Sequence, residues 1–392
     1  MVQNNAEDIG VFSCPVCLAN SGGAVETGLN GSVTSDGRYI GHIPLYDYCR
    51  KCGYIYRDRR DTLDFDKFYR EEYTLLSGEQ GMERLLYEDG GLAYAGYLVD
   101  FFADFLENSD KKKFLDIGAG KGNVVGALHA RFPEIRISAV EPGKAFAVLK
   151  DNKFLDEARN SFFSSRAFNG AVFDYISLSE VLEHVFDPRS FLEDVRLIMS
   201  DDSVLLISVP NVENDKYDFL SPDHISRFTP ESLENLFKVS GFRIVKTRVF
   251  QNSSSMVFIV KKGGNENIEA FDSLTVIRSA LDFIDRAIAD ATGLKNKIVA
   301  VYGQGLVLNY LIGQKIFRAE DIACVIDDNR AYYGKKWKGA ADIISFDDFL
   351  KNFHVKNIFL AMNECYQEQV VSKIPAIYDV FGSGVNIRRG RR

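Results

Sequence analysis

Apolar residues in the middle of the chain fall into short runs around a glycine-rich turn. Phe114, Leu115 and Ile117 precede the turn Gly118-Ala-Gly-Lys-Gly122, and a second apolar run, 137–140, ends at Glu141. Such runs predict strands, and the spacing of apolar residues over 123–132 predicts a helix between them. The order strand, glycine loop, helix, strand and acid predicts a site for an adenosine-containing cofactor.

The same order returns in the last third of the chain. Helical spacing over 271–291 leads to the run 297–305, which ends in Gly-Gln-Gly, and to the run 322–328, which ends in two aspartates. This pattern predicts a second Rossmann-like unit with Asp327 on a ribose. Leu308 occupies the position of the third fingerprint glycine. Two interpretations therefore stay open: a working dinucleotide site, or a fold used for packing or for another ligand.

Length and charge narrow the class of protein. A chain of 392 residues predicts two or three domains, and its net charge of −8 disfavours nucleic acid and membrane surfaces as partners. No apolar run reaches the roughly 20 residues of a membrane helix, and the first residues lack the pattern of a signal peptide. We expect a cytoplasmic protein with a small-molecule substrate. The sequence does not indicate the oligomeric state.

Four of the six cysteines form two Cys-x-x-Cys pairs, Cys14 with Cys17 and Cys49 with Cys52. Two such turns can supply the four thiolates of a tetrahedral zinc site, and Gly53 suits the tight turn of a zinc ribbon. A disulfide is the competing interpretation, which a reducing cytoplasm disfavours. We expect one structural zinc ion, because a closed four-thiolate site leaves no position for water or substrate.

The residues and the glycine spacing of the first glycine loop favour one cofactor. Asp116 precedes the loop, and the spacing is Gly-x-Gly-x-Gly rather than Gly-x-Gly-x-x-Gly. This combination favours S-adenosylmethionine (SAM) over NAD as the cofactor. The expected cofactor-binding residues are Asp116, Gly118, Ala119, Gly120, Asn123, Glu141, Pro142 and Ser179.

Three later segments carry a family resemblance. Residues 173–185, which include Leu182-Glu-His-Val185, are followed by Asp187-Pro188 and by the segment 204–211. With the glycine loop, they resemble class I SAM-dependent methyltransferases over about 110–262, and the expected antiparallel final hairpin is 243–250 with 256–261. A nucleotide-binding fold with another ligand is the alternative. The resemblance implies an α/β class with a Rossmann-like SAM-methyltransferase core.

The order of the parts adds a narrower resemblance. The order is a zinc ribbon over 1–62, a helical linker over 63–109, the SAM domain over 110–262 and a Rossmann-like domain over 263–392. In the linker, apolar residues over 92–106 have helical spacing and the preceding part is rich in tyrosine, from Tyr69 to Tyr87; the linker is either a lid over the SAM site or an ordinary packing helix with a loop. The order of the parts resembles the sugar C-methyltransferases that act on nucleotide-linked keto-sugars. Their terminal domain carries a Tyr-Gly-x-Gly loop and an Asp-Asp-Asn-like strand end, matched by Tyr302–Gly305 and Asp327–Asn329. The resemblance implies that the terminal domain helps to bind the nucleotide-sugar.

The same enzymes suggest catalytic residues. They carry a Tyr-His-Glu-His-x-x-Tyr-Phe element in which the last histidine is the base. Aligned on His224, this chain keeps an acid at Asp223 but has Ser221 for the tyrosine and Arg227 for the second aromatic residue. We expect His224, His184 and Asp223 to be catalytic. Tyr217 is a candidate for the missing hydrogen-bond donor to an enolate.

The sequence thus predicts methyl transfer from SAM to a nucleotide-linked sugar, in surface-polysaccharide or secondary-metabolite assembly. A histidine base favours methylation of carbon over oxygen. Two alternatives stay open. One is a zinc-ribbon RNA methyltransferase, which the acidic charge and the second Gly-x-Gly domain disfavour; the other is a non-catalytic scaffold, which the Asp116 and Glu141 motif disfavours.

Overall fold

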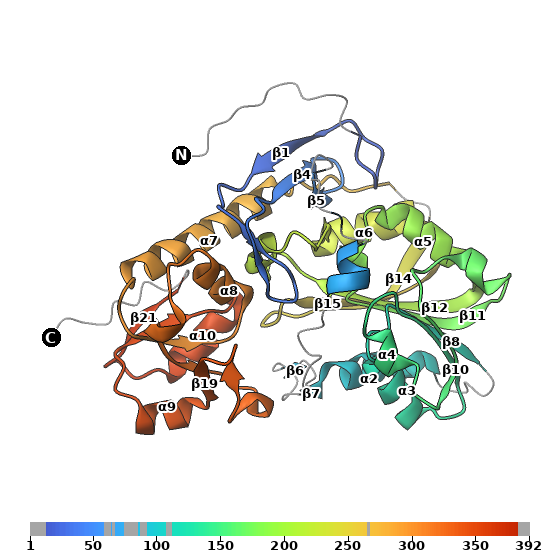
Figure 1. Cartoon of the computed structure of the whole chain (residues 1–392). Coiled ribbons are helices and arrows are strands. Elements are labelled where there is room, and N and C mark those ends of the chain that lie inside the picture. Colours follow the sequence, from blue (N-terminus) through green and yellow to red (C-terminus); the bar gives the residue numbers. More distant parts are fainter. Residues whose placement is uncertain are drawn as a thin grey trace.

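The computed structural model describes residues 13–58, 64, 67–73, 85–86, 92–106, 112–264 and 267–382. Figure 1 shows its three parts: an N-terminal sheet at the top, a central unit in green and yellow, and a C-terminal unit in orange and red. The expected α/β architecture is confirmed.

The central unit is a seven-stranded sheet in the order β10-β9-β8-β11-β12-β15-β14. Its strands are β8 (Lys113–Ile117), β9 (Arg136–Val140), β10 (Leu155–Arg159), β11 (Phe173–Ser179), β12 (Met199–Pro210), β14 (Phe242–Val249) and β15 (Ser255–Lys262). β15 alone runs antiparallel to the other strands of this sheet, and its hairpin with β14 is the predicted one. Because β8 has β9 on one side and β11 on the other, the strand order reverses there, and ligands of open α/β sheets bind at that edge.

Helices lie on both faces of the central sheet. Their bounds are α2 (Tyr94–Leu106), α3 (Asn123–Arg131), α4 (Phe146–Leu149), α5 (Pro188–Arg196) and α6 (Pro230–Val239). The sequence placed α2 in the segment between the zinc ribbon and the SAM domain, and its residues Leu98, Phe102 and Leu106 are buried against the sheet and α3. The helix is therefore part of the central unit. A two-stranded ladder of β6 (Leu85–Leu86) with β7 (Leu92–Ala93) precedes it.

The N-terminal sheet has the strand order β1-β4-β5-β13. Its own strands are β1 (Gly22–Glu26), β4 (Leu45–Cys49) and β5 (Ile55–Arg57), and the hairpin β2 (Ser32–Val33) with β3 (Tyr39–Ile40) projects from it. The fourth strand, β13 (Ser226–Arg227), comes from the central unit. The loop that carries His224 is therefore tied to the N-terminal sheet by backbone hydrogen bonds.

The C-terminal unit is a mostly parallel sheet in the order β18-β19-β17-β16-β20-β21. Its strands are β16 (Val299–Tyr302), β17 (Ile322–Ile326), β18 (Lys336–Trp337), β19 (Ala341–Ile344), β20 (Asn357–Leu360) and β21 (Asp379–Phe381). Its helices are α7 (Leu274–Gly293), α8 (Leu306–Gly313), α9 (Phe346–Asn352) and α10 (Glu364–Lys373). Strand order reverses at β16, which pairs with β17 and β20, as a Rossmann-like unit requires.

Helix α7 joins the parts. Its apolar face shares one core with Tyr46 of β4, Tyr217 of the central unit and Val301 of β16. In Figure 1 this helix crosses from the N-terminal sheet to the C-terminal unit. No helix among the described residues is long and apolar enough to cross a membrane.

Candidate functional site

The glycine loop after β8 has the left-handed backbone that its sequence predicts. Gly118, Gly120 and Gly122 have φ values of 75°, 55° and 92°, a region that residues with a Cβ rarely adopt. A Cβ on Gly118 would collide with Val181, which lies just after β11. The glycine loop and the turn that carries His184 are therefore in direct contact at the carboxyl edge of the sheet.

Glu141 closes the other side of this loop. Its two carboxylate oxygens accept hydrogen bonds from the backbone N–H groups of Gly120 (2.9 Å) and Gly143 (2.7 Å). Burial raises the pKa of Glu141. A carboxylate offers about four acceptor positions, so two remain for the hydroxyl groups of a ribose. The loop and Glu141 therefore fit the adenosine part of SAM.

The other predicted cofactor residues lie around this edge. Ala119 is buried, and Asn123 is the exposed first residue of α3. Pro142 directly follows Glu141, and Ser179 ends β11. Asp116 is fully buried, where it accepts a hydrogen bond from Ser177, and burial raises its pKa to about 7. The structure brings all of these residues to the carboxyl ends of β8, β9 and β11.

Glu180, directly after β11, also has a left-handed backbone, with φ of 54°. A non-glycine residue in this region stores strain, which is common at functional sites. Its N–H donates to Ser208, and its carboxylate accepts a hydrogen bond of 3.0 Å from Tyr94 at the start of α2. These contacts fix the start of the turn that leads to Glu183 and His184.

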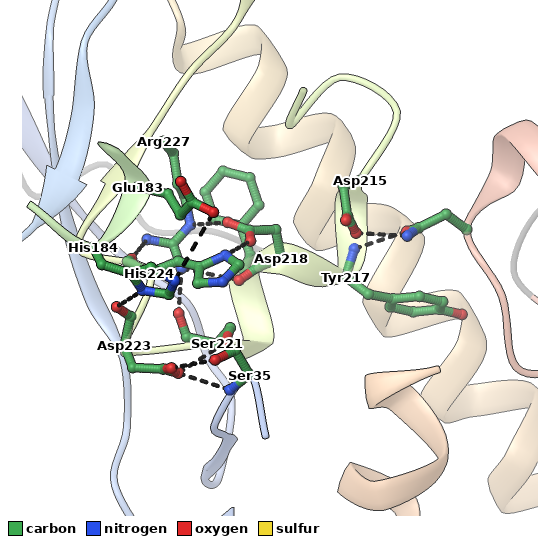
Figure 2. Close-up of polar contacts among 12 residues, drawn as sticks. Ser35, Glu183, His184, Asp215, Tyr217, Asp218, Ser221, Asp223, His224 and Arg227 are labelled. Carbon is green, nitrogen blue, oxygen red and sulfur yellow. Dashed lines mark hydrogen bonds and ion pairs between the residues drawn. The ribbon is translucent and has the colours of Figure 1, made fainter. Parts of the chain in front are cut away.

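His184 and His224 lie side by side, with ring centroids 4.8 Å apart (Figure 2). His184 belongs to the 3-10 turn η3 (Leu182–His184), and His224 to the loop before β13. The Nδ1 of His184 lies 3.1 Å from the backbone oxygen of Asp223, which can only accept, so this nitrogen carries a hydrogen. The structure brings the two histidines together, and their catalytic role stays a prediction.

The acid beside His224 is Asp218, not Asp223. Asp218 lies in the 3-10 helix η4 (Lys216–Leu220), and its carboxylate accepts from the Nδ1 of His224. Its second oxygen lies 2.7 Å from the guanidinium of Arg227, whose side chain is fully buried. Arg227 also donates to the backbone oxygens of His224 and Ser221. No pattern in the sequence marks Asp218, because only the folding of this loop brings it to His224.

The two imidazoles have opposite electrostatic surroundings. Burial and the neighbouring His224 lower the pKa of His184 to about 4. Burial by itself would lower the pKa of His224, but Asp218 outweighs it and raises that pKa to about 10. At neutral pH this favours a neutral His184 and a protonated His224. A protonated imidazole donates hydrogen bonds and does not act as a base.

Asp223 anchors the loop to the N-terminal hairpin. Its carboxylate accepts from the backbone N–H of Ser35 (2.8 Å) and from the hydroxyls of Ser35 (2.5 Å) and Ser221 (3.0 Å). The side chain is fully buried. These bonds occupy the carboxylate, so we assign Asp223 a positioning role in place of the predicted catalytic one.

A segment before the central unit packs on the histidines. The hydroxyl of Tyr69, in η1 (Phe68–Glu72), contacts the Nδ1 of His184 and donates to the backbone oxygen of Asp223 at 3.0 Å. Tyr73 packs edge-on against Tyr69. Residues 67–73 thus lie where the predicted lid would lie, and Tyr87 of that prediction is outside the described residues. Tyr217 points away from His224 in Figure 2 and packs on Phe283, whereas the rings of Tyr69 and Tyr73 pack against His184.

The four predicted zinc ligands come together in the N-terminal unit. The sulfurs of Cys14 and Cys52 are 3.6 Å apart, as are those of Cys17 and Cys49, and all four lie within 4.8 Å of one another. Around zinc, with bonds of about 2.3 Å, sulfurs of a tetrahedral site are about 3.8 Å apart. The group is therefore compatible with zinc. Gly53 has φ of 73°, and a Cβ there would collide with Phe271, which explains the glycine in this turn.

A cavity of about 240 Å³ lies between the central and C-terminal units. Its walls are Asp215, Tyr217, Gly303, Gln304, Gly305, Leu306, Ala361, Met362, Asn363 and Tyr366. The glycines follow β16 and Ala361 follows β20, so the cavity lies at the point where strand order reverses. The N–H of Gly305 is bound to the backbone oxygen of Ala361, and Asp327 accepts from Gln304. Helix η4 thus contributes to both places: its Tyr217 lines this cavity, and its Asp218 contacts His224.

A family described as a methyltransferase domain matches residues 92–247. The match covers α2 and most of the central sheet, including the glycine loop, Glu141 and both histidines. It supports a SAM-dependent methyltransferase enzyme. No curated protein matches the chain.

Solved structures with similar parts include several methyltransferases. Mitomycin 7-O-methyltransferase is 15% identical over 43% of this chain and 54% of its own, with a TM-score of 0.37. A SAM-dependent methyltransferase from Clostridium acetobutylicum is 14% identical over 46% of this chain and 95% of its own, with a TM-score of 0.37. The plantazolicin methyltransferase, solved with SAH, is 14% identical over 43% of this chain and 82% of its own, with a TM-score of 0.35. The chain aligns with about half the length of the first of these.

Proposed function

We propose that the chain is a SAM-dependent methyltransferase that methylates a nucleotide-linked sugar. The contact between Gly118 and Val181 carries this proposal. It sets the predicted cofactor loop against the turn that leads to His184, so a methyl group held at the loop faces the two histidines. The predicted cofactor loop and the histidine pair lie at the same edge of the central sheet, and both fall within the residues that match the methyltransferase domain.

We assign cofactor binding to the glycine loop after β8 and to Glu141, the acid that follows β9. Glu141 has free acceptor positions for both ribose hydroxyls, and the glycine backbone allows close approach of the ligand. When bound, SAM supplies a methyl group on a sulfonium that departs as a neutral thioether. The protein therefore has to align the acceptor and stabilise the charge that develops on it.

We assign that stabilisation to the histidine pair. For a carbon acceptor beside a ketone, and for a hydroxyl acceptor, negative charge develops on an oxygen of the sugar. His224 is held by Asp218 through Nδ1, which leaves Nε2 to face such an oxygen. This changes the role expected from the sequence, in which His224 was a base. Methylation of carbon remains the preferred version of the proposal, with the neutral His184 as the proton acceptor.

The nucleotide part of the substrate is assigned to the cavity between the units. It lies at the strand-order reversal of the C-terminal sheet, where Rossmann-like units bind nucleotides. Helix η4 connects the cavity to Asp218 and His224, so a ligand that fills the cavity can extend to the histidines. We also propose that Cys14, Cys17, Cys49 and Cys52 hold one structural zinc ion.

The test uses the full-length protein with SAM and a panel of nucleotide-linked sugars, including 4-keto-sugars. Mass spectrometry detects a product that is heavier by one methylene group, and NMR identifies the methylated atom. A parallel incubation in deuterated water without SAM reports exchange beside the ketone. We expect a methylated product, and exchange if the acceptor is carbon.

Matched variants connect the product to the site. Glu141→Gln should weaken SAH binding by about tenfold or more, because a neutral amide is a poorer partner for two hydroxyls than a carboxylate. Glu157→Gln, on the exposed edge strand β10, should bind SAH like the unchanged protein. Absence of any methylated sugar, together with normal SAH binding, would overturn the sugar assignment and direct the search to RNA.

A further inference from the structure

Three metal-ligating side chains converge at the proposed acceptor site. Glu183, His184 and His224 each offer one ligand atom, and these atoms lie within 4.8 Å of one another. The arrangement differs from the four-cysteine group, because it contains oxygen and nitrogen ligands only. Two histidines and one carboxylate form the ligand set of many open divalent metal sites.

Glu183 gives a second, independent indication of a ligand. Its side chain is almost completely buried, and its Oε2 has no hydrogen-bond partner among the described residues. Its Oε1 lies 3.9 Å from the Nε2 of His184, too far for a hydrogen bond. A buried carboxylate oxygen without a partner is costly, and a cation at this place would remove that cost.

The ring nitrogens that face away from the carboxylate are already bound. Nδ1 of His224 is paired with Asp218, and Nδ1 of His184 is held by Tyr69 and the backbone oxygen of Asp223. Metal-binding histidines have this pattern, in which a carboxylate or carbonyl holds one ring nitrogen and orients the other toward the metal. Figure 2 shows Glu183 next to the two histidines.

Burial and the neighbouring Glu180 raise the pKa of Glu183, and His224 opposes that rise. The guanidinium of Arg227 is directed at Asp218. Around a divalent ion with bonds of about 2.1 Å, neighbouring ligand atoms are about 3 to 3.5 Å apart. Side-chain shifts of roughly 1 Å would bring the three groups to that spacing.

We propose that Glu183, His184 and His224 bind one divalent transition-metal ion, of the manganese or zinc type, at the acceptor site. Three protein ligands leave positions open, and an oxygen of the acceptor would occupy one of them. This role rests on the proposed function, since either a hydroxyl or a keto oxygen develops negative charge during methyl transfer. The ion would take the place of the proton on Nε2 of His224 and would occupy Nε2 of His184, so the proton-accepting role proposed for His184 belongs to the metal-free form.

The test measures ion binding without SAM or sugar. Full-length protein that retains its zinc, verified by metal analysis, is titrated with MnCl2, and free Mn2+ is followed by electron paramagnetic resonance. We expect one Mn2+ ion per chain. Glu183→Gln should weaken its binding by at least about tenfold, and Asp218→Asn by about 10- to 100-fold, as for other residues that orient a metal ligand.

Glu193→Gln is the matched control, because Glu193 is exposed and paired with Arg189 on helix α5. It should bind Mn2+ like the unchanged protein, and all variants should bind SAH equally. Failure of the unchanged protein to bind Mn2+, or equal binding by Glu183→Gln, would overturn the site. Ion binding with no methylated sugar would support the site and count only against the proposed function.

Discussion

The guanidinium of Arg227 lies 2.7 Å from the carboxylate of Asp218, and both side chains are buried. Arg227 also lies over the ring of Tyr46, at 4.1 Å from its centroid. One arginine thus joins β4 of the N-terminal sheet, helix η4 and the loop of His224. This pair explains why the chain has an arginine where the sequence comparison expected an aromatic residue.

Replacement of Arg227 should be strongly destabilising. Arg227→Met leaves Asp218 as a buried charge next to His224, and breaking a buried pair in this way costs about 3–5 kcal/mol. The double variant Arg227→Met, Asp218→Asn should recover part of that loss. Urea unfolding measures both. Arg136→Met removes an exposed pair with Asp156 and should cost no more than about 1 kcal/mol. Equal losses for Arg227→Met and Arg136→Met would contradict the buried-pair assignment.

Loss of the four-cysteine group should loosen the histidine loop. Cys49→Ser should lower the zinc content by about one ion per chain, because the remaining thiolates cannot complete a tetrahedral site. Since β13 pairs with β5, amide hydrogen exchange over 222–228 should become faster. Mass spectrometry of exchanged peptides reports this. Cys365→Ser, on helix α10, is the control and should retain zinc. An unchanged rate of amide exchange over 222–228 in Cys49→Ser would show that the loop keeps its structure without the metal.

Two glycines should respond in opposite directions to alanine. A Cβ on Gly305 would collide with the backbone oxygen of Ala361, so Gly305→Ala should destabilise the C-terminal unit and disturb the cavity. Gly293 ends helix α7 with no atom within 4 Å of an added Cβ. Gly293→Ala should stabilise by up to about 1 kcal/mol, because glycine loses more backbone entropy in a helix. Thermal unfolding compares the two, and a rise in melting temperature for Gly305→Ala would refute the close approach.

Asp116 should make stability depend on pH. Burial raises its pKa from 3.8 to about 7, so the folded state disfavours the ionised carboxyl. The resulting loss of stability is absent below about pH 4, grows as the pH rises to about 7 and is then constant. Asp116→Asn cannot ionise, so it should gain stability relative to the unchanged protein over that interval. Denaturant unfolding between pH 4 and 8 measures the difference; parallel stability curves would rule out the raised pKa.

The short-range patterns of the sequence were sufficient for much of the fold. Apolar spacing predicted α2, α3 and α7, and alternation of apolar runs with glycine turns predicted β8, β9, β16 and β17. The paired cysteines predicted a group of four sulfurs, and the structure brings them together. These features depend on residues close in sequence or on a repeated motif, so local preference and side-chain type reveal them.

Tertiary structure alone decided the composition of the site. The sequence located His184 and His224, but Asp218 reached His224, Ser35 reached Asp223 and Tyr69 reached His184 only when separate segments folded together. Helix α2 packs on the central unit because its apolar face is stable only when it is buried against another apolar surface, here the sheet and α3. Long-range contacts of polar side chains leave no periodic signal in the chain. The sequence therefore determined the elements and the cofactor loop, and the packing of the three units determined which acids and tyrosines surround the histidines.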